Sequence, residues 1–355
     1  MLKVLFCGLK NEYGKPERGV SFEYKHFFGA LQRMPGVEAE MFAMDEVARE
    51  VGRDEMNRRL IYRVEDSRPD LLFCFLFTDE LKPETIGYIT RKTSTKTFNW
   101  FGDDHWRFYA YSRRWAPLFT LVSTTDGLAY KNYQAAGISN VIKTQWGVNQ
   151  HLYKPQDKSR DQGQYNITFY GQKYGNRGSY INSLKKNDLP ARGIGRGWGG
   201  SGADVQEMLD IYSFSKINLN FTETYYYGLK KKINLIARLF IKKELGRYRL
   251  NLSQFADNWR AMVGTQRRTI KARTFEVPAC GGFLLTGPSD DPIDEYFVPG
   301  KEIAVFNTAS DLIAQCRYFL ECADERQAMA KAGFERALRE HTYEQRFRKI
   351  FEKLL

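Results

Sequence analysis

The sequence has few cysteines and no long apolar run, and both shortages exclude classes of protein. Its 355 residues include five cysteines, none in a Cys-x-x-Cys pair. Three of them lie within apolar or small-residue runs, which is typical of core residues in a reducing compartment and not of disulfides or zinc ligands. No stretch approaches the ~20 apolar residues that a membrane-spanning helix requires. The five are Cys7, Cys74, Cys280, Cys316 and Cys322.

The N-terminal segment MLKVLFCG also lacks the longer apolar region and the cleavage site of a signal peptide. It reads instead as a first buried strand. We therefore expect a cytoplasmic protein.

The composition is that of a globular protein with an excess of positive charge. Hydrophobic residues make up 43% of the chain and aromatic residues 15%, and the net charge is +12. Such a charge favours an acidic partner, namely nucleic acid, an anionic membrane surface or a phosphorylated ligand. A solvated basic surface explains it equally well.

Apolar runs typical of buried strands alternate with helical patterns along the whole chain, and this alternation predicts doubly wound parallel sheets. The polar segment 147–163 interrupts the series and predicts a domain boundary. We predict an N-terminal Rossmann-like domain at 1–148, a second α/β domain at 149–342, and a C-terminal helix at 343–355 that packs back toward the first domain. The expected strands are 3–8, 38–44, 70–77, 97–101, 120–124, 141–145, 166–170, 191–198, 216–221, 283–286 and 302–306.

The stretch Lys271–Gly287, KARTFEVPACGGFLLTG, carries most of the functional signal. It predicts a helix that bears Glu276, a stop at Gly281–Gly282, and a short buried strand. An acidic residue just before a helix-ending glycine pair suits a ligand site at the edge of an α/β sheet. A solvated helical glutamate is the alternative.

Three motifs in a fixed order resemble the C-terminal domain of the GT-B glycosyltransferases. They are RTFEVPACGGFLLT, EYFVPGKEIAVF and AGFERALREHTYEQRF. The resemblance is closest to the CgeB-like, spore-maturation-type group related to families 1 and 4, and it runs from about Asn166 to the C-terminus. The first half matches more loosely, through YG…GVSFEY and FGDD. The resemblance implies two Rossmann-like domains facing a central cleft and a nucleotide-sugar donor bound mainly by the second domain.

The resemblance also implies roles for residues of the second domain. Glu276 occupies the place of the glutamate that binds the donor ribose. In the loop FYGQKYGNR, Gly171 lets the backbone approach the diphosphate, and Lys173 and Arg177 supply positive charge. An ordinary basic loop is the alternative for this segment.

Two further basic residues, Lys271 and Arg273, are also donor-binding candidates, although surface pairing along the helix explains them equally well. The family carries a second glutamate eight positions before the ribose-binding one, near the sugar. This chain has Arg268 there, so the donor sugar and the mechanism do not follow from the resemblance.

The first domain is expected to serve the acceptor. The segment FGDDHW follows a predicted strand, and Asp103, Asp104 and His105 are our candidates for the base that takes the acceptor proton. A helix-capping aspartate beside a surface histidine is the alternative. The DD pair is not a DxD metal motif, and related enzymes neutralise the leaving diphosphate with basic groups, so we expect no obligatory metal and no cofactor.

Residues 223–264 form a longer insertion than the resemblance implies. The run LKKKINLIARLFIKKELGRYRL predicts a cationic amphipathic helix, which offers possible peripheral contact with the inner face of a membrane through 229–250. A helix packed by its apolar face onto the second domain is the alternative.

These observations predict a metal-independent glycosyltransferase that moves a sugar from a nucleotide-sugar donor to an unidentified glycan, lipid-linked or protein acceptor, with retention of configuration preferred. A sugar-nucleotide epimerase of GT-B fold and a non-catalytic nucleotide-sugar-binding relative are the alternatives. A basic nucleic-acid-binding protein is a further one, but no recognition-helix, RRM or OB pattern supports it, so nucleic acid is not an expected partner.

Overall fold

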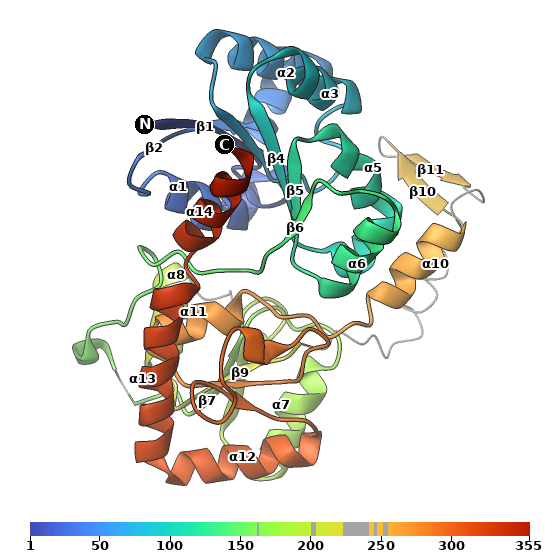
Figure 1. Cartoon of the computed structure of the whole chain (residues 1–355). Helices are drawn as coiled ribbons and strands as arrows, with labels where there is room; N and C mark the ends of the chain where they lie inside the picture. Colours follow the sequence, from blue (N-terminus) through green and yellow to red (C-terminus); the bar gives the residue numbers. More distant parts are fainter. Residues whose placement is uncertain (162, 200–203, 223–240, 245–246, 251–254) are drawn as a thin grey trace. The chain divides into compact units, whose positions relative to one another are not determined.

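The computed structural model describes residues 1–161, 163–199, 204–222, 241–244, 247–250 and 255–355. The chain forms two compact units (Figure 1). Unit 1 comprises residues 1–145 together with 343–355, and unit 2 comprises residues 146–342.

Unit 1 is built on a six-stranded sheet in which every neighbouring pair is parallel. The strand order is β2-β1-β3-β4-β5-β6. After β1 the chain adds β2 on one side of β1, and it then adds β3 to β6 in succession on the other side of β1. The strands are β1 (Leu2–Gly8), β2 (Val37–Ala43), β3 (Leu71–Cys74), β4 (Lys96–Phe101), β5 (Leu121–Thr124) and β6 (Val141–Lys143).

Helices cover both faces of this sheet, because alternate side chains of each strand point to opposite sides. Leu5 and Cys7 of β1 join the core beneath α2 (Met44–Ser67), α3 (Pro83–Lys92) and α6 (Gly127–Ala135). Phe6 points the other way and contacts Phe28, beside α1 (Gly29–Leu31).

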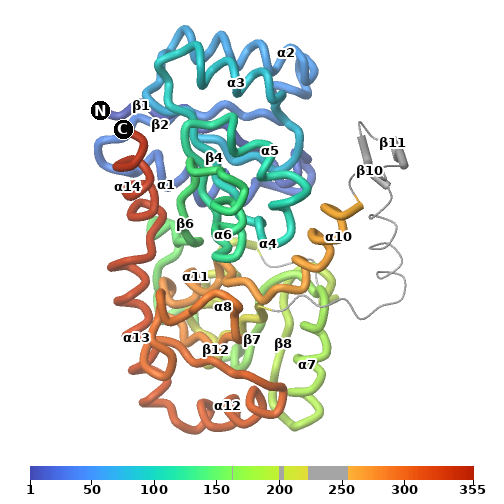
Figure 2. Tube along the Cα trace, turned by 45° about the vertical axis from the view of Figure 1, so that its right-hand side comes forward, coloured from blue at the N-terminus to red at the C-terminus, as the bar shows by residue number. Residues whose placement is uncertain are grey.

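The C-terminal helix α14 (Tyr343–Leu354) completes the second face of the unit 1 sheet (Figures 1 and 2). Phe347 is fully buried, and its ring centroid lies 5.7 Å from that of Phe27 and 5.2 Å from that of Phe73. The buried positions recur at helical spacing, which makes one buried and mainly apolar stripe. They are Tyr343, Arg346, Phe347, Ile350, Phe351 and Leu354.

Unit 2 is built on a five-stranded parallel sheet in the order β13-β12-β9-β7-β8. One core cluster lies beneath α7 (Arg177–Lys186) and α12 (Ala309–Glu321), and another joins α8 (Val205–Phe214), α11 (Arg273–Ala279) and α13 (Ala323–Glu340). The strands are β7 (Ile167–Tyr170), β8 (Ala191–Ile194), β9 (Ile217–Asn220), β12 (Leu284–Thr286) and β13 (Ala304–Val305). The predicted α/β class with two doubly wound parallel sheets is therefore confirmed.

The insertion differs from its prediction. The segments β10 (Ile241–Glu244) and β11 (Arg247–Leu250) pair as an antiparallel hairpin, so the helix predicted for 229–250 is wrong for this part. Gly246 lies between them in sequence, and glycine is a poor residue for a helix interior. The remainder of that prediction, at 229–240, lies outside the described residues, and α10 (Phe255–Gly264) follows the hairpin.

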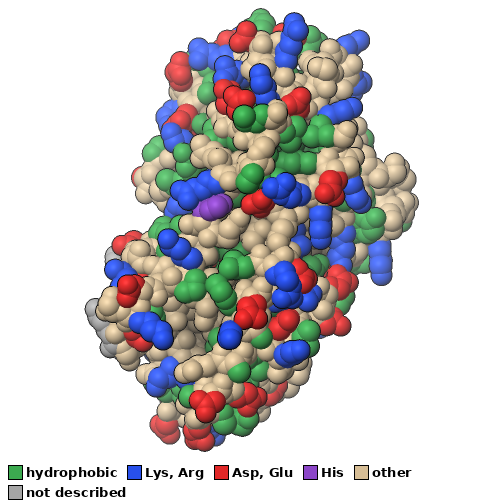
Figure 3. All heavy atoms as spheres, turned by 60° about the vertical axis from the view of Figure 1, so that its left-hand side comes forward, with side chains coloured by type: hydrophobic (Ala, Val, Ile, Leu, Met, Phe, Trp, Pro, Cys, Tyr) green, Lys and Arg blue, Asp and Glu red, His purple; other side chains and the backbone are tan. Residues whose placement is uncertain are grey.

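Charge of both signs is spread over the surface. On the face shown in Figure 3, basic side chains are interspersed with acidic and apolar ones, so this face has no continuous basic patch. Within the described ranges, no helix is long and apolar enough to span a bilayer.

Candidate functional site

The carboxyl edge of the unit 2 sheet has a topological switch point between β7 and β9. After β7 the chain crosses to β8 on one side, and it then returns to β9 on the other side. Ligands of open α/β sheets bind in the crevice at such a point, outside the carboxyl ends of the strands. Here Gly171 follows β7, and Asn220 is the last residue of β9.

The backbone at the end of β7 adopts a conformation that requires glycine. Gly171 has a φ of 147°, and a Cβ added there would lie 2.4 Å from Nη2 of Arg273. Its carbonyl accepts a hydrogen bond of 2.8 Å from Nε1 of Trp198. Gly195, after β8, comes so close that its own added Cβ would lie 2.9 Å from the Gly171 oxygen. The two glycines therefore let the β7 and β8 loops converge against a guanidinium group.

Arg273, the first residue of α11, lies over the switch point. Its Nη1 donates a hydrogen bond of 3.0 Å to Oδ1 of Asn220, and its guanidinium carbon lies 4.6 Å from the ring centroid of Phe169. The Asn220 amide in turn donates to the hydroxyls of Thr274 at 3.2 Å and Thr286 at 3.0 Å. This network joins β9, α11 and β12 and fixes the position of the cation.

Glu276 lies one turn further along α11 and is only 6% exposed. Burial raises the pKa of its carboxyl from 4.5 to about 7, while the charge of Arg273 and a hydrogen bond with Tyr153 oppose this shift. Tyr153 is itself buried, so its hydroxyl gives Glu276 a fixed partner inside unit 2. The structure thus combines a fixed cation with a carboxylate that changes protonation near neutral pH.

Arg177, at the start of α7, lies on the same aromatic ring as Arg273. Its guanidinium carbon is 5.2 Å from the Phe169 centroid, and its Nη1 donates 3.0 Å to the carbonyl of Gln172. Lys173 is exposed, and its ammonium lies 5.3 Å from the Trp198 ring centroid. Gly171, Arg177 and Arg273 are thereby brought together around Phe169, with Lys173 at the rim.

Two basic residues that precede α11 have polar partners of their own. The Lys271 ammonium donates a hydrogen bond to the hydroxyl of Thr269. Arg268 pairs with Asp290 through an Nε–Oδ1 contact of 2.8 Å. Arg268 is therefore held by an acidic side chain of the loop after β12.

The predicted acceptor residues follow β4 in unit 1. Asp104 begins α4 (Asp104–Arg107), is 2% exposed, and accepts a hydrogen bond of 3.0 Å from the Tyr133 hydroxyl. Burial raises its pKa to about 6, against hydrogen bonds from Ser112, Thr124 and Tyr133. Asp103 and His105 are half-buried. Of the three candidates, only these two have accessible surface from which to reach a substrate.

Sequence reasoning missed three residues of the unit 2 site, namely Tyr153, Trp198 and Asn220. A polar residue that ends the buried strand KINLNF was a usable signal for Asn220. Tyr153 lies in the polar segment that was interpreted as a linker, and no local pattern marks it. Within the described part of the chain, no group of three or more His, Cys, Asp or Glu is placed to hold a metal ion.

Comparison with known proteins agrees with this architecture. Residues 177–352, just under half of the chain, match a family model described as glycosyl transferase-like. No curated protein sequence matches significantly. Many solved structures do match, at identities so low that they establish only the fold.

Three of these structures cover nearly the whole chain. Sucrose-phosphate synthase from Thermosynechococcus elongatus superposes with a TM-score of 0.60 at 11% identity, covering 99% of this chain and 100% of that one. A glycosyltransferase from Rickettsia africae gives 0.59 at 9% identity, with 99% and 97% covered. Anabaena HepE in complex with UDP-glucose gives 0.58 at 11% identity, with both chains fully covered. The chain therefore has the GT-B fold, and its residues 177–352 match a glycosyl transferase-like family.

Proposed function

We propose that the protein is a glycosyltransferase that uses a nucleoside-diphosphate sugar, with a UDP-sugar as the first candidate donor. The observation that carries the proposal is the nearness of the Arg273 cation to the buried carboxyl of Glu276 at the β7/β9 switch point. The family match over 177–352 and the UDP and UDP-glucose complexes of the structurally similar HepE support it. The motifs of the second half favour the CgeB-like group within these enzymes.

The ribose and the diphosphate of the donor each have matching groups in unit 2. The Glu276 carboxylate accepts hydrogen bonds from the two ribose hydroxyls. Arg273 and Arg177 neutralise the diphosphate, and Gly171 lets the β7 loop approach it closely. Lys173, being exposed at the rim, adds a mobile positive charge.

In the reaction, the acceptor hydroxyl oxygen forms a bond to the anomeric carbon of the sugar on the face from which the diphosphate leaves, so the configuration is retained. The bond between that carbon and the diphosphate oxygen breaks, and the nucleoside diphosphate leaves with the electron pair. The acceptor proton passes to a base, for which Asp103 and His105 of unit 1 are the candidates with accessible surface. The two arginines stabilise the charge that develops on the leaving group.

The proposal includes retention of configuration and independence of metal. The enzymes that the second half resembles favour retention, and the basic groups available for the diphosphate favour independence of metal. NMR of the glycosidic product reports its anomeric configuration, and activity in excess EDTA reports any need for a divalent ion. The acceptor class is a glycan, a lipid-linked saccharide or a protein.

A thermal-shift screen against UDP, GDP, TDP and their sugars tests the donor. A ligand at about 100 times its Kd stabilises the fold by about 2.7 kcal/mol, which gives a clear rise in Tm. Glu276→Ala should remove the rise, whereas Glu335→Ala, at an exposed glutamate of α13, should keep it. If no nucleotide at millimolar concentration shifts the wild-type Tm, the proposal fails.

A further inference from the structure

Unit 1 has a switch point of its own, between β1 and β3, and two aromatic side chains meet there. Tyr13 lies in the loop after β1, and Phe77 lies in the segment after β3. Their ring centroids are 5.4 Å apart in an edge-to-face arrangement. Because ligands of open α/β sheets bind at this position, the exposed Tyr13 and the half-buried Phe77 are placed as a binding surface would be.

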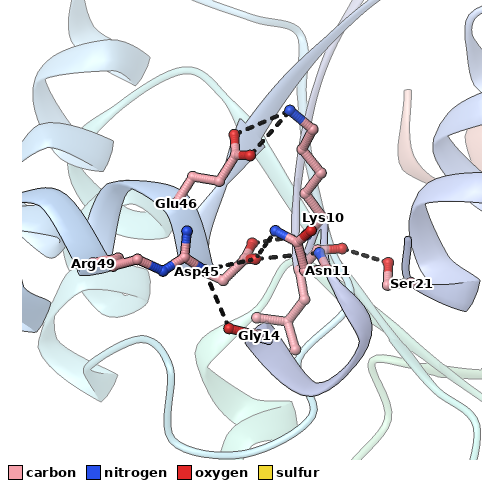
Figure 4. A network of polar contacts seen from close by, with 8 residues as sticks. Lys10, Asn11, Gly14, Ser21, Asp45, Glu46 and Arg49 are labelled. Carbon is pink, nitrogen blue, oxygen red and sulfur yellow. Dashed lines mark hydrogen bonds and ion pairs between the residues drawn. The ribbon is translucent and has the colours of Figure 1, made fainter. Parts of the chain in front are cut away.

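The loop that carries Tyr13 is held rigidly. The Asp45 carboxylate, 4% exposed, accepts hydrogen bonds from the amide of Lys10 at 2.8 Å and from the amide and side chain of Asn11 at 3.2 and 2.7 Å (Figure 4). Ser21 closes the loop by donating 2.6 Å to the carbonyl of Leu9. The polar network therefore fixes both ends of the segment between them.

Within this fixed loop, Tyr13 has a strained backbone and an exposed ring. Its φ is 54°, a conformation that costs an L-residue about 1 kcal/mol or more, and the residue is 53% exposed. Neither core packing nor ease of folding accounts for a tyrosine at such a position. Strain of this kind persists where a surrounding network enforces it, and it clusters at ligand-binding sites.

Two arginines extend the aromatic surface. The Arg107 guanidinium carbon lies 5.4 Å from the Phe77 centroid, 5.3 Å from that of Trp106 and 4.2 Å from that of Tyr111. Arg18 lies 5.2 Å from the Tyr13 centroid. We call Tyr13, Phe77, Trp106 and Arg107 the aromatic platform.

Charges of both signs surround the platform: the guanidinium groups of Arg18 and Arg107 lie on its rings, and carboxylates lie close to Tyr13. Burial raises the pKa of Tyr13, and the carboxylates of Glu12, Asp103 and Glu23 raise it further, while Arg18 opposes them. With both signs present, these surroundings do not select for a phosphorylated or carboxylated ligand. They suit a neutral ligand rich in hydroxyl groups, which donate hydrogen bonds to carboxylates.

We propose that the aromatic platform binds a neutral saccharide, which is the acceptor of the transfer reaction. One C–H face of a sugar ring stacks on Tyr13 and Phe77, and its hydroxyls donate to Glu12 and Asp103. This inference rests on the proposed function, and it narrows the acceptor from a glycan, lipid or protein to an uncharged glycan. It also brings the acceptor to the side of the sheet that carries Asp103.

The test is an array of neutral and acidic oligosaccharides probed with the full chain. Tyr13→Ala should lower the affinity for the preferred neutral glycan by about tenfold, which is the upper end of the effect of one aromatic contact. Tyr13→Phe keeps the ring and should bind nearly as the wild type does. Tyr62→Ala, at a tyrosine of α2 that is 64% exposed, is the matched control and should leave binding unchanged.

Calorimetry with UDP on the same proteins separates this inference from the proposed function. The inference predicts an unchanged UDP Kd in Tyr13→Ala. If the wild type binds UDP but no neutral glycan, or prefers acidic glycans, the platform proposal is overturned and the donor site is untouched. Equal glycan binding by the wild type and Tyr13→Ala also overturns it. Glycan binding without binding of any nucleotide would instead refute the proposed function.

Discussion

The carboxyl group of Glu276 titrates near neutral pH, and this gives a sharp prediction at the scale of one residue. Its pKa in the folded protein is about 7, raised from 4.5 by burial. Only the ionised form accepts both ribose hydroxyls, so UDP affinity should increase several-fold between pH 6 and pH 8. Titration calorimetry at several pH values measures this, and Glu276→Gln should bind weakly with little pH dependence.

Fold stability should change in the opposite direction with pH. Because the folded state raises the pKa of Glu276, the neutral form stabilises the fold below about pH 4.5, and this contribution is lost as pH rises through about 7. Glu276→Gln should therefore gain stability relative to the wild type from pH 5 to pH 8. Glu335→Gln on α13 is the control. Parallel stability profiles for the wild type and Glu276→Gln would contradict the assignment.

Asp104 offers a second test, in unit 1. Tyr133→Phe removes a hydrogen bond to a buried carboxyl whose pKa is about 6. At pH 8 the lost partner served a charged group, and we expect a cost of about 1.5–3 kcal/mol; at pH 4.5 it served a neutral group, and we expect about 1 kcal/mol. Urea unfolding at both pH values gives the difference, with Tyr62→Phe as the exposed control. An equal cost at both pH values would mean that Asp104 does not titrate in this range.

For single residues, the sequence pointed to candidate site residues but could not predict which of their side chains are buried. The EVPACG motif was enough to single out Glu276, and the structure adds its buried position beside Arg273. In FGDDHW, nothing local distinguishes the aspartate that turns into the core from the one that stays at the edge. That choice depends on Tyr133, which lies 29 residues further along the chain.

At the scale of elements, the meeting of β7, β8 and α11 depends on glycine. Gly171→Ala places a methyl group 2.4 Å from the Arg273 guanidinium, so the cation must move away from the switch point. We expect UDP affinity to fall at least about tenfold, the loss typical of one charge-assisted contact. Calorimetry measures it.

Gly36→Ala is the matched control for this change. Gly36 also has a positive φ, 83°, but an added Cβ would meet nothing within 4 Å. It should therefore carry similar backbone strain and lower the Tm without changing UDP affinity. Equal effects of both variants on UDP binding would show that strain, and not displacement of Arg273, is responsible.

Most elements could be predicted because buried parallel strands are nearly continuous apolar runs, as in Leu71–Cys74. The paired strands β10 and β11 could not be predicted, since their apolar residues also fit one face of a helix in the sequence, and periodicity over so short a span does not separate a strand from a helix. The π-helical segment Tyr24–Phe28 has no local signature either.

At the scale of the molecule, unit 1 depends on residues from both ends of the chain. Phe347→Ala on α14 removes a fully buried ring packed against Phe27 and Phe73, and we expect unit 1 to lose about 3–5 kcal/mol. Lys349→Ala, on the exposed face of the same helix, should be nearly neutral. Thermal unfolding of the Phe347 variant should separate into an early transition of unit 1 and a later one of unit 2. A single transition, shifted as a whole, would mean that the two units unfold together.

The segments near the beginning and the end of unit 2 are hydrogen-bonded to each other. The amide of Val148 donates 2.9 Å to the carbonyl of His341, and Val148 and Thr342 form a parallel bridge. Unit 2 is thus a continuous segment whose first and last residues are neighbours, inserted into unit 1.

The position of unit 2 between the two segments of unit 1 sets an order of events during protein synthesis. Residues 1–145 leave the ribosome first, yet their sheet lacks the α14 cover over Phe27 and Phe73 until residues 343–354 have been made. Unit 2 is complete before that. The half of the protein that is translated first is therefore the last to mature, and its aromatic face is exposed to chaperones, or to aggregation, for the whole time that unit 2 is being synthesised.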